Sequence, residues 1–248
     1  LKTNFNWLIN EKHSASYGVN AVYYNLSPGI LTPSSASSLL TPKRLDDENA
    51  AELALYISDN WNISDRLSVD FGFRYSIYSK LGPLSYYKYS SEDRSESSIT
   101  DTVNVGKAGL VKPFHGPEFR ISARYSINDN LSVKAGFNSM RQNIHMLSNT
   151  SSVSPTDIWK MSDANIDPQK GWQAAFGLYH NAFNRRVELS LEGYYKEMND
   201  YLDYKSGAKL NMNEHIERDV LKTQGSAYGI EFMAKKPLGK LNGWIAYT

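Results

Sequence analysis

The sequence contains no cysteine, so it can build neither a disulfide framework nor a thiolate metal site. It also has almost no imbalance of charge. Its 27 Lys and Arg residues face 26 Asp and Glu residues, which leaves a formal net charge of +1. A nucleic-acid partner requires a strongly basic surface, so we expect none.

Long hydrophobic runs are absent as well. The mean hydropathy is -0.50, and no apolar stretch approaches the roughly 18 residues that a membrane helix needs. This excludes a helical membrane span but not a β-barrel, whose strands mix polar and apolar positions. The motifs GxGxxG, GxSxG and HExxH and the P-loop are also missing, so we expect neither an enzyme nor a cofactor.

The sequence is instead rich in aromatic residues, at 12%, and in alternating patterns. The clearest pattern lies in residues 51–78 and surrounds a short turn. Its apolar side chains fall on odd positions and its polar ones on even positions, for example Phe71 and Phe73 against Asp70 and Arg74. A period of two predicts strands with one apolar face and one polar face.

The shared parity of the two strands predicts a three-residue turn, residues 64–66, with Ile63 opposite Leu67. Residues 118–138 repeat the pattern around a turn at 128–130, a turn that places Arg124 opposite Lys134. In residues 172–198 the parity changes between the strands, which requires an even loop. We expect a two-residue loop, Phe183 and Asn184, that sets Tyr179, Gly177 and Ala175 across from Glu188, Ser190 and Glu192.

The connections sort by length. Tight turns are expected near residues 11, 65, 129, 184 and 239, and long polar loops at 26–49, 79–117, 141–170 and 199–224. Outer-membrane barrels show this arrangement, with short periplasmic turns and long extracellular loops. The fold class predicted is all-β: an antiparallel meander of about ten strands that belongs to a transmembrane β-barrel.

Three segments carry a family resemblance: EFRISARYSINDNLSVKAGFN, NIDPQKGWQAAFGLYHNAFNRRVELSLEGYYKEMNDYLDY and GSAYGIEFMAKKPLGKLNGWIAYT. In this order they resemble the barrel strands of TonB-dependent outer-membrane receptors, particularly the Bacteroidetes type. The resemblance implies a barrel of roughly 22 strands with a plugged lumen. The chain lacks a plug domain, a TonB-box segment and a terminal aromatic strand end. Residues 1–248 are therefore expected to be an internal portion, about half of a barrel, and to form a curved open sheet.

The resemblance also implies a function and partners. Such a receptor binds a scarce nutrient (a siderophore, cobalamin, a glycan or a peptide) and imports it across the Gram-negative outer membrane with energy supplied by TonB. The implied partners are outer-membrane lipid, the TonB complex acting through the plug domain, the small nutrient and a surface lipoprotein. Two alternatives stay open: a passive porin, adhesin or autotransporter barrel, and a soluble antiparallel carbohydrate-binding sandwich.

Two groups of residues are candidates for binding. The first comprises charged side chains expected to face the lumen: Asp70, Arg74, Arg120, Arg124, Lys134, Glu188, Glu192 and Lys196. They either contact a substrate or an acid of the plug, or form a hydrated wall. The second comprises the loop aromatics Tyr86, Tyr87, Tyr89 and Trp159, which either stack on a ligand ring or pack the loops together. The acidic runs 46–48 and 92–93 are interpreted as solvated loop charge rather than calcium sites.

Overall fold

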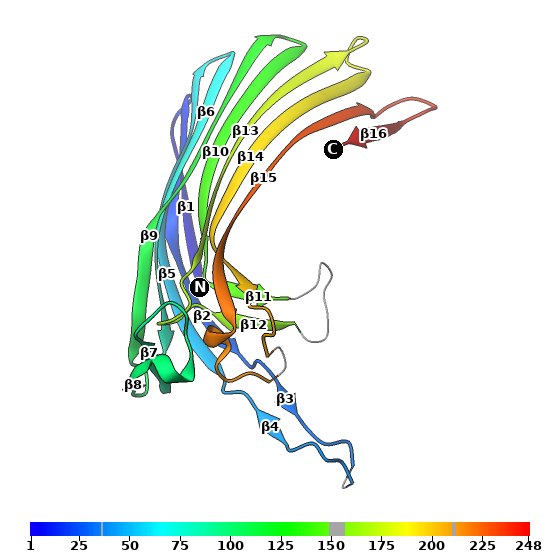
Figure 1. The fold of residues 1–248 in the computed structure, drawn as a ribbon. Helices are drawn as coiled ribbons and strands as arrows, with labels where there is room; N and C mark the ends of the chain where they lie inside the picture. The colour runs from blue at the N-terminus through cyan, green and yellow to red at the C-terminus, as the bar shows by residue number, and fades with distance from the viewer. Residues whose placement is uncertain (36, 149–156, 210–211) are drawn as a thin grey trace.

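In the residues that the structure describes, the main element is an antiparallel sheet of ten strands in sequence order. The computed structural model describes residues 1–35, 37–148, 157–209 and 212–248. The strands are β1 (Lys2–Asn10), β2 (His13–Leu26), β5 (Glu48–Ser64), β6 (Leu67–Leu81), β9 (Leu110–Asn128), β10 (Leu131–Gln142), β13 (Gln169–Ala182), β14 (Val187–Tyr204), β15 (Val220–Lys236) and β16 (Gly243–Tyr247). The sheet curves but stays open (Figure 1), as predicted. Because the ten strands lie in a single sheet, the sandwich alternative is wrong.

The predicted division of each strand into two faces is confirmed. Phe71 pairs with Ile121 and Phe73 with Phe119, so these residues share a face, and Phe71 and Ile121 remain 43% and 42% exposed. The even-numbered Tyr78 of β6 packs instead against Met161 of a loop hairpin, which lies on the concave side in Figure 1. Hence the polar, even-numbered face of β6 is concave and the apolar face is convex.

Two registers differ in detail from those predicted. In β5 and β6, Asn62 pairs with Ser68 and Ser64 pairs with Leu67, so Ile63 lies in a bulge rather than opposite Leu67. The bulge confines the difference to the end of the hairpin, and the pairs beyond it keep the predicted register.

The loop between β13 and β14 has four residues rather than two. Ala182 pairs with Val187, and Phe183, Asn184 and Arg185 all have positive φ. The prediction that Tyr179 faces Glu188 is therefore wrong. The observed pairs are Tyr179 with Ser190, Gly177 with Glu192, Ala175 with Tyr194 and Asn181 with Glu188. Loops of two and four residues have the same parity, so the face pattern alone could not separate them.

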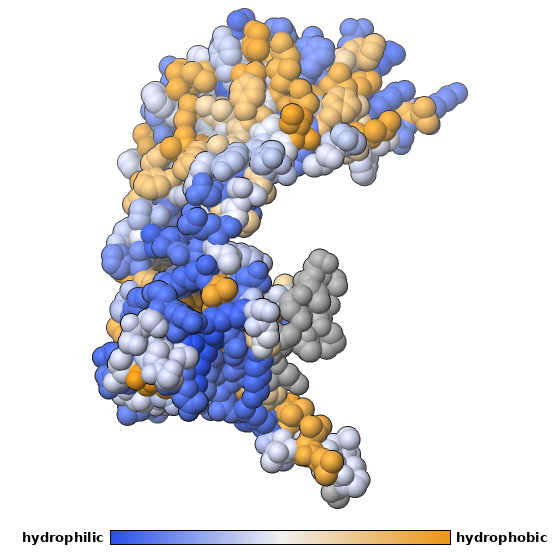
Figure 2. Space-filling model, in the orientation of Figure 1, coloured by the Kyte–Doolittle hydropathy of each residue, from blue (hydrophilic) through white to orange (hydrophobic). Residues whose placement is uncertain are grey.

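The long connections are shorter than predicted. They span residues 27–47, 82–109, 143–168 and 205–219, because residues such as 79–81 and 110–117 extend the sheet. These residues extend the strands beyond the part of the sheet that has an apolar face. Neither face needs to be apolar there, so apolar and polar residues no longer alternate and the sequence pattern does not reveal the strand. Figure 2 shows hydrophobic surface gathered over the short-turn half and mostly hydrophilic surface toward the long connections, with a separate hydrophobic patch on the hairpin of connection 27–47.

All four long connections lie at one end of the sheet (Figure 1). They carry three small hairpins: β3 (Ile30–Leu31) with β4 (Lys43–Arg44), β7 (Leu84–Tyr89) with β8 (Ile99–Val105), and β11 (Ile144–Leu147) with β12 (Ile158–Met161). Two 3₁₀ turns, η1 (Glu96–Ser98) and η2 (Ile216–Arg218), accompany them. Within the part of the chain that the structure describes, no helix is long and apolar enough to cross a membrane.

The register of the last strand, β16, fixes which face each of its side chains takes. Ile245 pairs with Ala234 and Tyr247 with Phe232, so Ile245 and Tyr247 lie on the convex, apolar face. Trp244 pairs with Lys235 and lies on the concave face.

Candidate functional site

The eight charged residues predicted to face the lumen all lie on the concave face. The strand register fixes this, because directly paired residues share a face: Gly72 pairs with Arg120, Ser68 with Arg124, and Glu192 with Gly177. The eight do not form one cluster, however. Seven fall into three groups that differ in their partners, and Arg120, which pairs across the sheet with Gly72 and Asn138, belongs to none of them.

Arg74 is held between two acids. Its guanidinium lies 2.5 Å from Glu52 and 3.4 Å from Glu118. Asn143, from the connection after β10, donates to the other oxygen of Glu52 at 3.2 Å. The Arg74 group therefore links the barrel wall to a long connection.

The second group lies near the short turns. Arg124 pairs with Lys134 as predicted, and both line a concave pocket of about 850 Å³. Asp70 lines the same pocket, but its oxygens accept from Asn60 at 2.6 Å and Ser122 at 3.1 Å. Among the residues that the structure describes, no carboxylate forms an ion pair with Arg124 or Lys134.

The third group lies on β14. Glu188 lies 3.6 Å from the ammonium of Lys235. Glu192 pairs across the sheet with Glu231, a second carboxylate on the same face. Lys196 pairs with Gln173 and Ala227. The concave wall thus carries Arg120, Arg124 and Lys134 on β9 and β10, and a mixture of carboxylates and lysines on β14 and β15.

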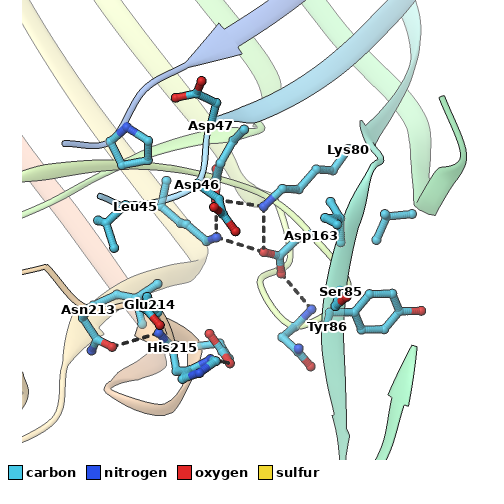
Figure 3. A pocket seen from close by; sticks show the side chains of 18 of the residues that line it. Leu45, Asp46, Asp47, Lys80, Ser85, Tyr86, Asp163, Asn213, Glu214 and His215 are labelled. Atoms are coloured by element: carbon cyan, nitrogen blue, oxygen red, sulfur yellow. Dashed lines mark hydrogen bonds and ion pairs between the residues drawn. The ribbon is translucent and has the colours of Figure 1, made fainter. Parts of the chain in front are cut away.

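Side chains from different connections surround a cavity of about 750 Å³ at the long-loop end, here called the mouth cavity. Each of the four long connections contributes to its lining, and Figure 3 labels residues from all four together with Lys80 of β6. Asp46 comes from the connection after β2, Tyr86 from the one after β6, Asp163 from the one after β10 and Glu214 from the one after β14. The mouth cavity is therefore built by residues far apart in the sequence.

The floor of the mouth cavity is a buried group of two acids and two lysines, here called the buried quartet: Glu48, Lys80, Lys160 and Asp163. The Lys80 ammonium lies 2.8 Å from Glu48 and 3.5 Å from Asp163. Lys160 contacts Glu48 and lies 3.2 Å from Asp163. Glu48 also accepts from the Met161 amide at 2.9 Å. The contacts between Lys80 and Asp163 and their partners are drawn as dashed lines in Figure 3. Together with the Met161 amide bond, the contacts of the buried quartet fasten the β11–β12 hairpin to β5 and β6.

Electrostatics hold the buried quartet ionised. Burial alone would raise the pKa of the Asp163 carboxyl, but Lys160 and Lys80 bring that pKa well below its ordinary value. Burial alone would lower the pKa of Lys160, and Glu48 and Asp163 raise it instead. Each charge thus finds its counter-charge within the buried quartet.

A buried histidine lies next to the buried quartet. His145 of β11 is fully buried, and its Nε2 lies 2.8 Å from the Ser162 hydroxyl. Burial lowers the pKa of His145 to about 4, so the ring is neutral at neutral pH. His145 therefore packs the hairpin and offers no charge to a ligand.

The four loop aromatics divide between the two roles considered for them. Tyr87 and Tyr89 pack within the loops: Arg218 lies 5.4 Å from the Tyr87 ring centre, and the Tyr89 hydroxyl donates to Glu217 at 2.8 Å. Trp159 lines the mouth cavity and is 49% exposed. Tyr86 also lines it, although its ring points away from Lys80 and Asp163 in Figure 3. Trp159 is thus the aromatic ring most open to a ligand.

Sequence reasoning missed the buried quartet. The prediction that residues 46–48 are solvated charge is wrong for Glu48, which is 6% exposed. No local pattern reveals this, because its partners are 32 and 112 residues away. The prediction holds for Asp93, which pairs with Lys205 while 90% exposed. In the described residues, no group of three or more acidic or histidine side chains is placed to hold a metal.

Comparisons with known proteins agree with this architecture. A family model described as "TonB dependent receptor-like, beta-barrel" matches residues 1–248. A search of curated protein sequences found no match.

Solved structures share the fold at low sequence identity. The ferric-catecholate import receptor Fiu from E. coli K12, in its closed form, is 15% identical, with 92% of this chain and 33% of that chain covered and a TM-score of 0.53. The FrpB iron transporter of Neisseria meningitidis is 12% identical, with 95% and 33% covered and a TM-score of 0.59. The ferripyoverdine receptor of Pseudomonas aeruginosa is 13% identical, with 95% and 29% covered and a TM-score of 0.58. The chain spans about a third of the length of these structures.

Proposed function

Because the chain belongs to the TonB-dependent receptor-like β-barrel family, we propose that it forms part of the wall of an outer-membrane receptor. This receptor binds a scarce nutrient and imports it with energy supplied by TonB. The observation that carries the proposal is the mouth cavity: four long connections converge at one end of the concave wall and enclose about 750 Å³, a volume typical of small-molecule sites.

The convex face supports a location in the Gram-negative outer membrane. Along β6 the apolar alternation runs from Leu67 to Ile77. At ~3.3 Å per residue and a ~45° tilt, this stretch is roughly 23 Å high, close to the ~25 Å apolar band of outer-membrane barrels. Outer-membrane lipid would cover this face.

The concave charges fit a wall that encloses an occupant. Arg124 lies directly opposite Lys134, and Glu192 directly opposite Glu231. Like charges in such pairs repel unless a counter-charge or water lies between them. A plug domain, through which TonB acts in this family, would supply that counter-charge. The Bacteroidetes type and a surface lipoprotein partner stay predictions.

Nutrient uptake in the native host tests the proposal. The gene for the full-length receptor and the gene for TonB are deleted separately. Uptake of a ferric siderophore, cobalamin, an oligosaccharide and a peptide is then measured under scarcity. We expect both deletions to abolish uptake of the same nutrient, and the restored receptor gene to recover it. Uptake that needs the receptor but not TonB would instead identify a passive porin.

A further inference from the structure

The mouth cavity is lined by more acids than bases. Six carboxylates border it, against three permanent cations. The carboxylates belong to Asp46, Asp47, Glu48, Asp163, Glu214 and Glu217, and the cations to Arg44, Lys80 and Lys160. A concave site lined by one sign of charge concentrates ligands of the opposite sign.

Two of the three cations are closed off from a ligand. Lys80 and Lys160 are bound within the buried quartet, with side-chain exposures of only 9% and 15%. Arg44 lies 3.1 Å from Asp47, and its side chain is 62% exposed. Among the described residues that line the mouth cavity, an anionic ligand would therefore reach one permanent cation, Arg44, and would have to compete with Asp47 for it.

The acids are not all engaged. Asp46 is exposed, and no hydrogen bond or ion pair to its side chain occurs within the described part of the chain. Glu214 pairs with Lys43 at 2.9 Å, but its side chain stays 54% exposed. Glu217, by contrast, is 12% exposed and accepts from Tyr89, so its role is structural. Asp46 and Glu214 are the carboxylates most available to a ligand.

An aromatic face completes the lining. Trp159 is 49% exposed and comes from a different connection than Asp46 or Glu214. Aromatic faces attract ammonium and guanidinium groups through the ring quadrupole. Carboxylates on two connections and an indole on a third thus surround the space in which a cationic group would lie.

We propose that the mouth cavity selects a positively charged organic ligand, one that bears ammonium or guanidinium groups as a short basic peptide does, and disfavours anionic ferric chelates. This inference rests on the proposed function, because it assigns a ligand class to the mouth cavity of an import receptor. Asp46 and Glu214 would contact the ligand's cationic groups, and Trp159 would pack against one of them.

Direct binding to the purified full-length receptor tests the proposal. The probes are trilysine, trialanine, triglutamate and a ferric tris-catecholate, each measured by calorimetry at low and physiological salt. We expect trilysine to bind most tightly, to weaken as salt rises, and to lose roughly twofold to fivefold in affinity with each of Asp46→Asn and Glu214→Gln. The control Glu92→Gln, at a side chain that is 88% exposed and does not line the cavity, should leave binding unchanged.

In the binding assay, two results would overturn the proposal: tighter binding of triglutamate or the ferric chelate than of trilysine, or trilysine binding that is unaffected in the double variant Asp46→Asn/Glu214→Gln. The thermal unfolding temperature of each variant, measured on the detergent-solubilised receptor, confirms that the barrel is intact. TonB-dependent import of an anionic nutrient would reject the charge preference but retain the import function. Loss of TonB dependence for every nutrient would reject the import function, and the binding order would still report the charge preference.

Discussion

The substitution Glu48→Gln tests how the β11–β12 hairpin is held on the concave wall. Glu48 is the acceptor shared by the ammonium groups of Lys80 and Lys160 and by the Met161 amide. Glutamine has nearly the same shape but no charge. It leaves two buried lysines with Asp163 as their remaining acid.

The magnitude follows from the burial of the buried quartet. Removal of one partner from a buried ion pair costs ~3–5 kcal/mol, and the lower end applies because the glutamine oxygen still accepts one hydrogen bond. Each 1.4 kcal/mol is about tenfold in an equilibrium constant. The hairpin should therefore open about 100-fold more often. Amide hydrogen exchange at residues 144–147 and 158–161 of the full-length receptor measures this opening.

The exposed pair of Lys88 and Asp101 provides the control. Both side chains are 56% exposed at a separation of 3.2 Å. The substitution Asp101→Asn should therefore change the free energy of opening of the β7–β8 hairpin, measured by amide exchange, by less than ~1 kcal/mol. The claim that the buried quartet holds the hairpin would be refuted if the amide exchange rates of residues 158–161 in Glu48→Gln stayed within threefold of the wild-type rates.

Three further predictions concern acid, lipid and topology. Because burial lowers the pKa of His145 to about 4, His145 takes up a proton in the open hairpin as pH falls below about 6.5, but not in the closed one. The free energy of hairpin opening, measured by amide exchange, should therefore fall by up to ~3 kcal/mol between pH 6.5 and 4. The substitution His145→Gln should abolish this fall. Asp163 does not contribute to this loss, because a lowered acid pKa gives stability that persists down to about pH 4. Phe71→Lys on the convex face should cost ~2–4 kcal/mol of unfolding free energy in lipid vesicles, whereas Ser122→Lys on the concave face should cost under half of that; equal costs would contradict the assignment of faces. Protease added to intact cells should cut within residues 82–109 and spare the turn at 128–130, and cleavage only after outer-membrane permeabilisation would reverse the orientation.

The sequence predicted the sheet because each strand carries its own evidence. Phe71, Phe73, Ile121 and their polar neighbours alternate without interruption, and a one-residue slip would move every apolar side chain to the other face. The same logic fixed Arg124 opposite Lys134. It failed at residues 183–186, because loops of two and four residues preserve the same faces.

The site was less predictable because it depends on tertiary contacts. Asp46 and Glu48 are two residues apart, yet Asp46 is exposed while Glu48 is buried by lysines from β6 and β12. Likewise Tyr87 and Trp159 are similar as loop aromatics, but only Tyr87 is covered, by Arg218 and His215. No local pattern carries such information, since the partners lie on separate connections.

Cysteine accessibility tests the central claim most directly: that the convex face meets lipid and the mouth cavity opens to the cell exterior. The chain has no cysteine of its own, so single substitutions at Trp159, Ile121 and Asp129 of the full-length receptor report cleanly if its remaining residues also lack cysteine. A membrane-impermeant thiol reagent should label Trp159→Cys on intact cells and Asp129→Cys only after outer-membrane permeabilisation. Ile121→Cys should react only with a lipid-soluble reagent. Labelling of Ile121→Cys by the impermeant reagent on intact cells would contradict the account.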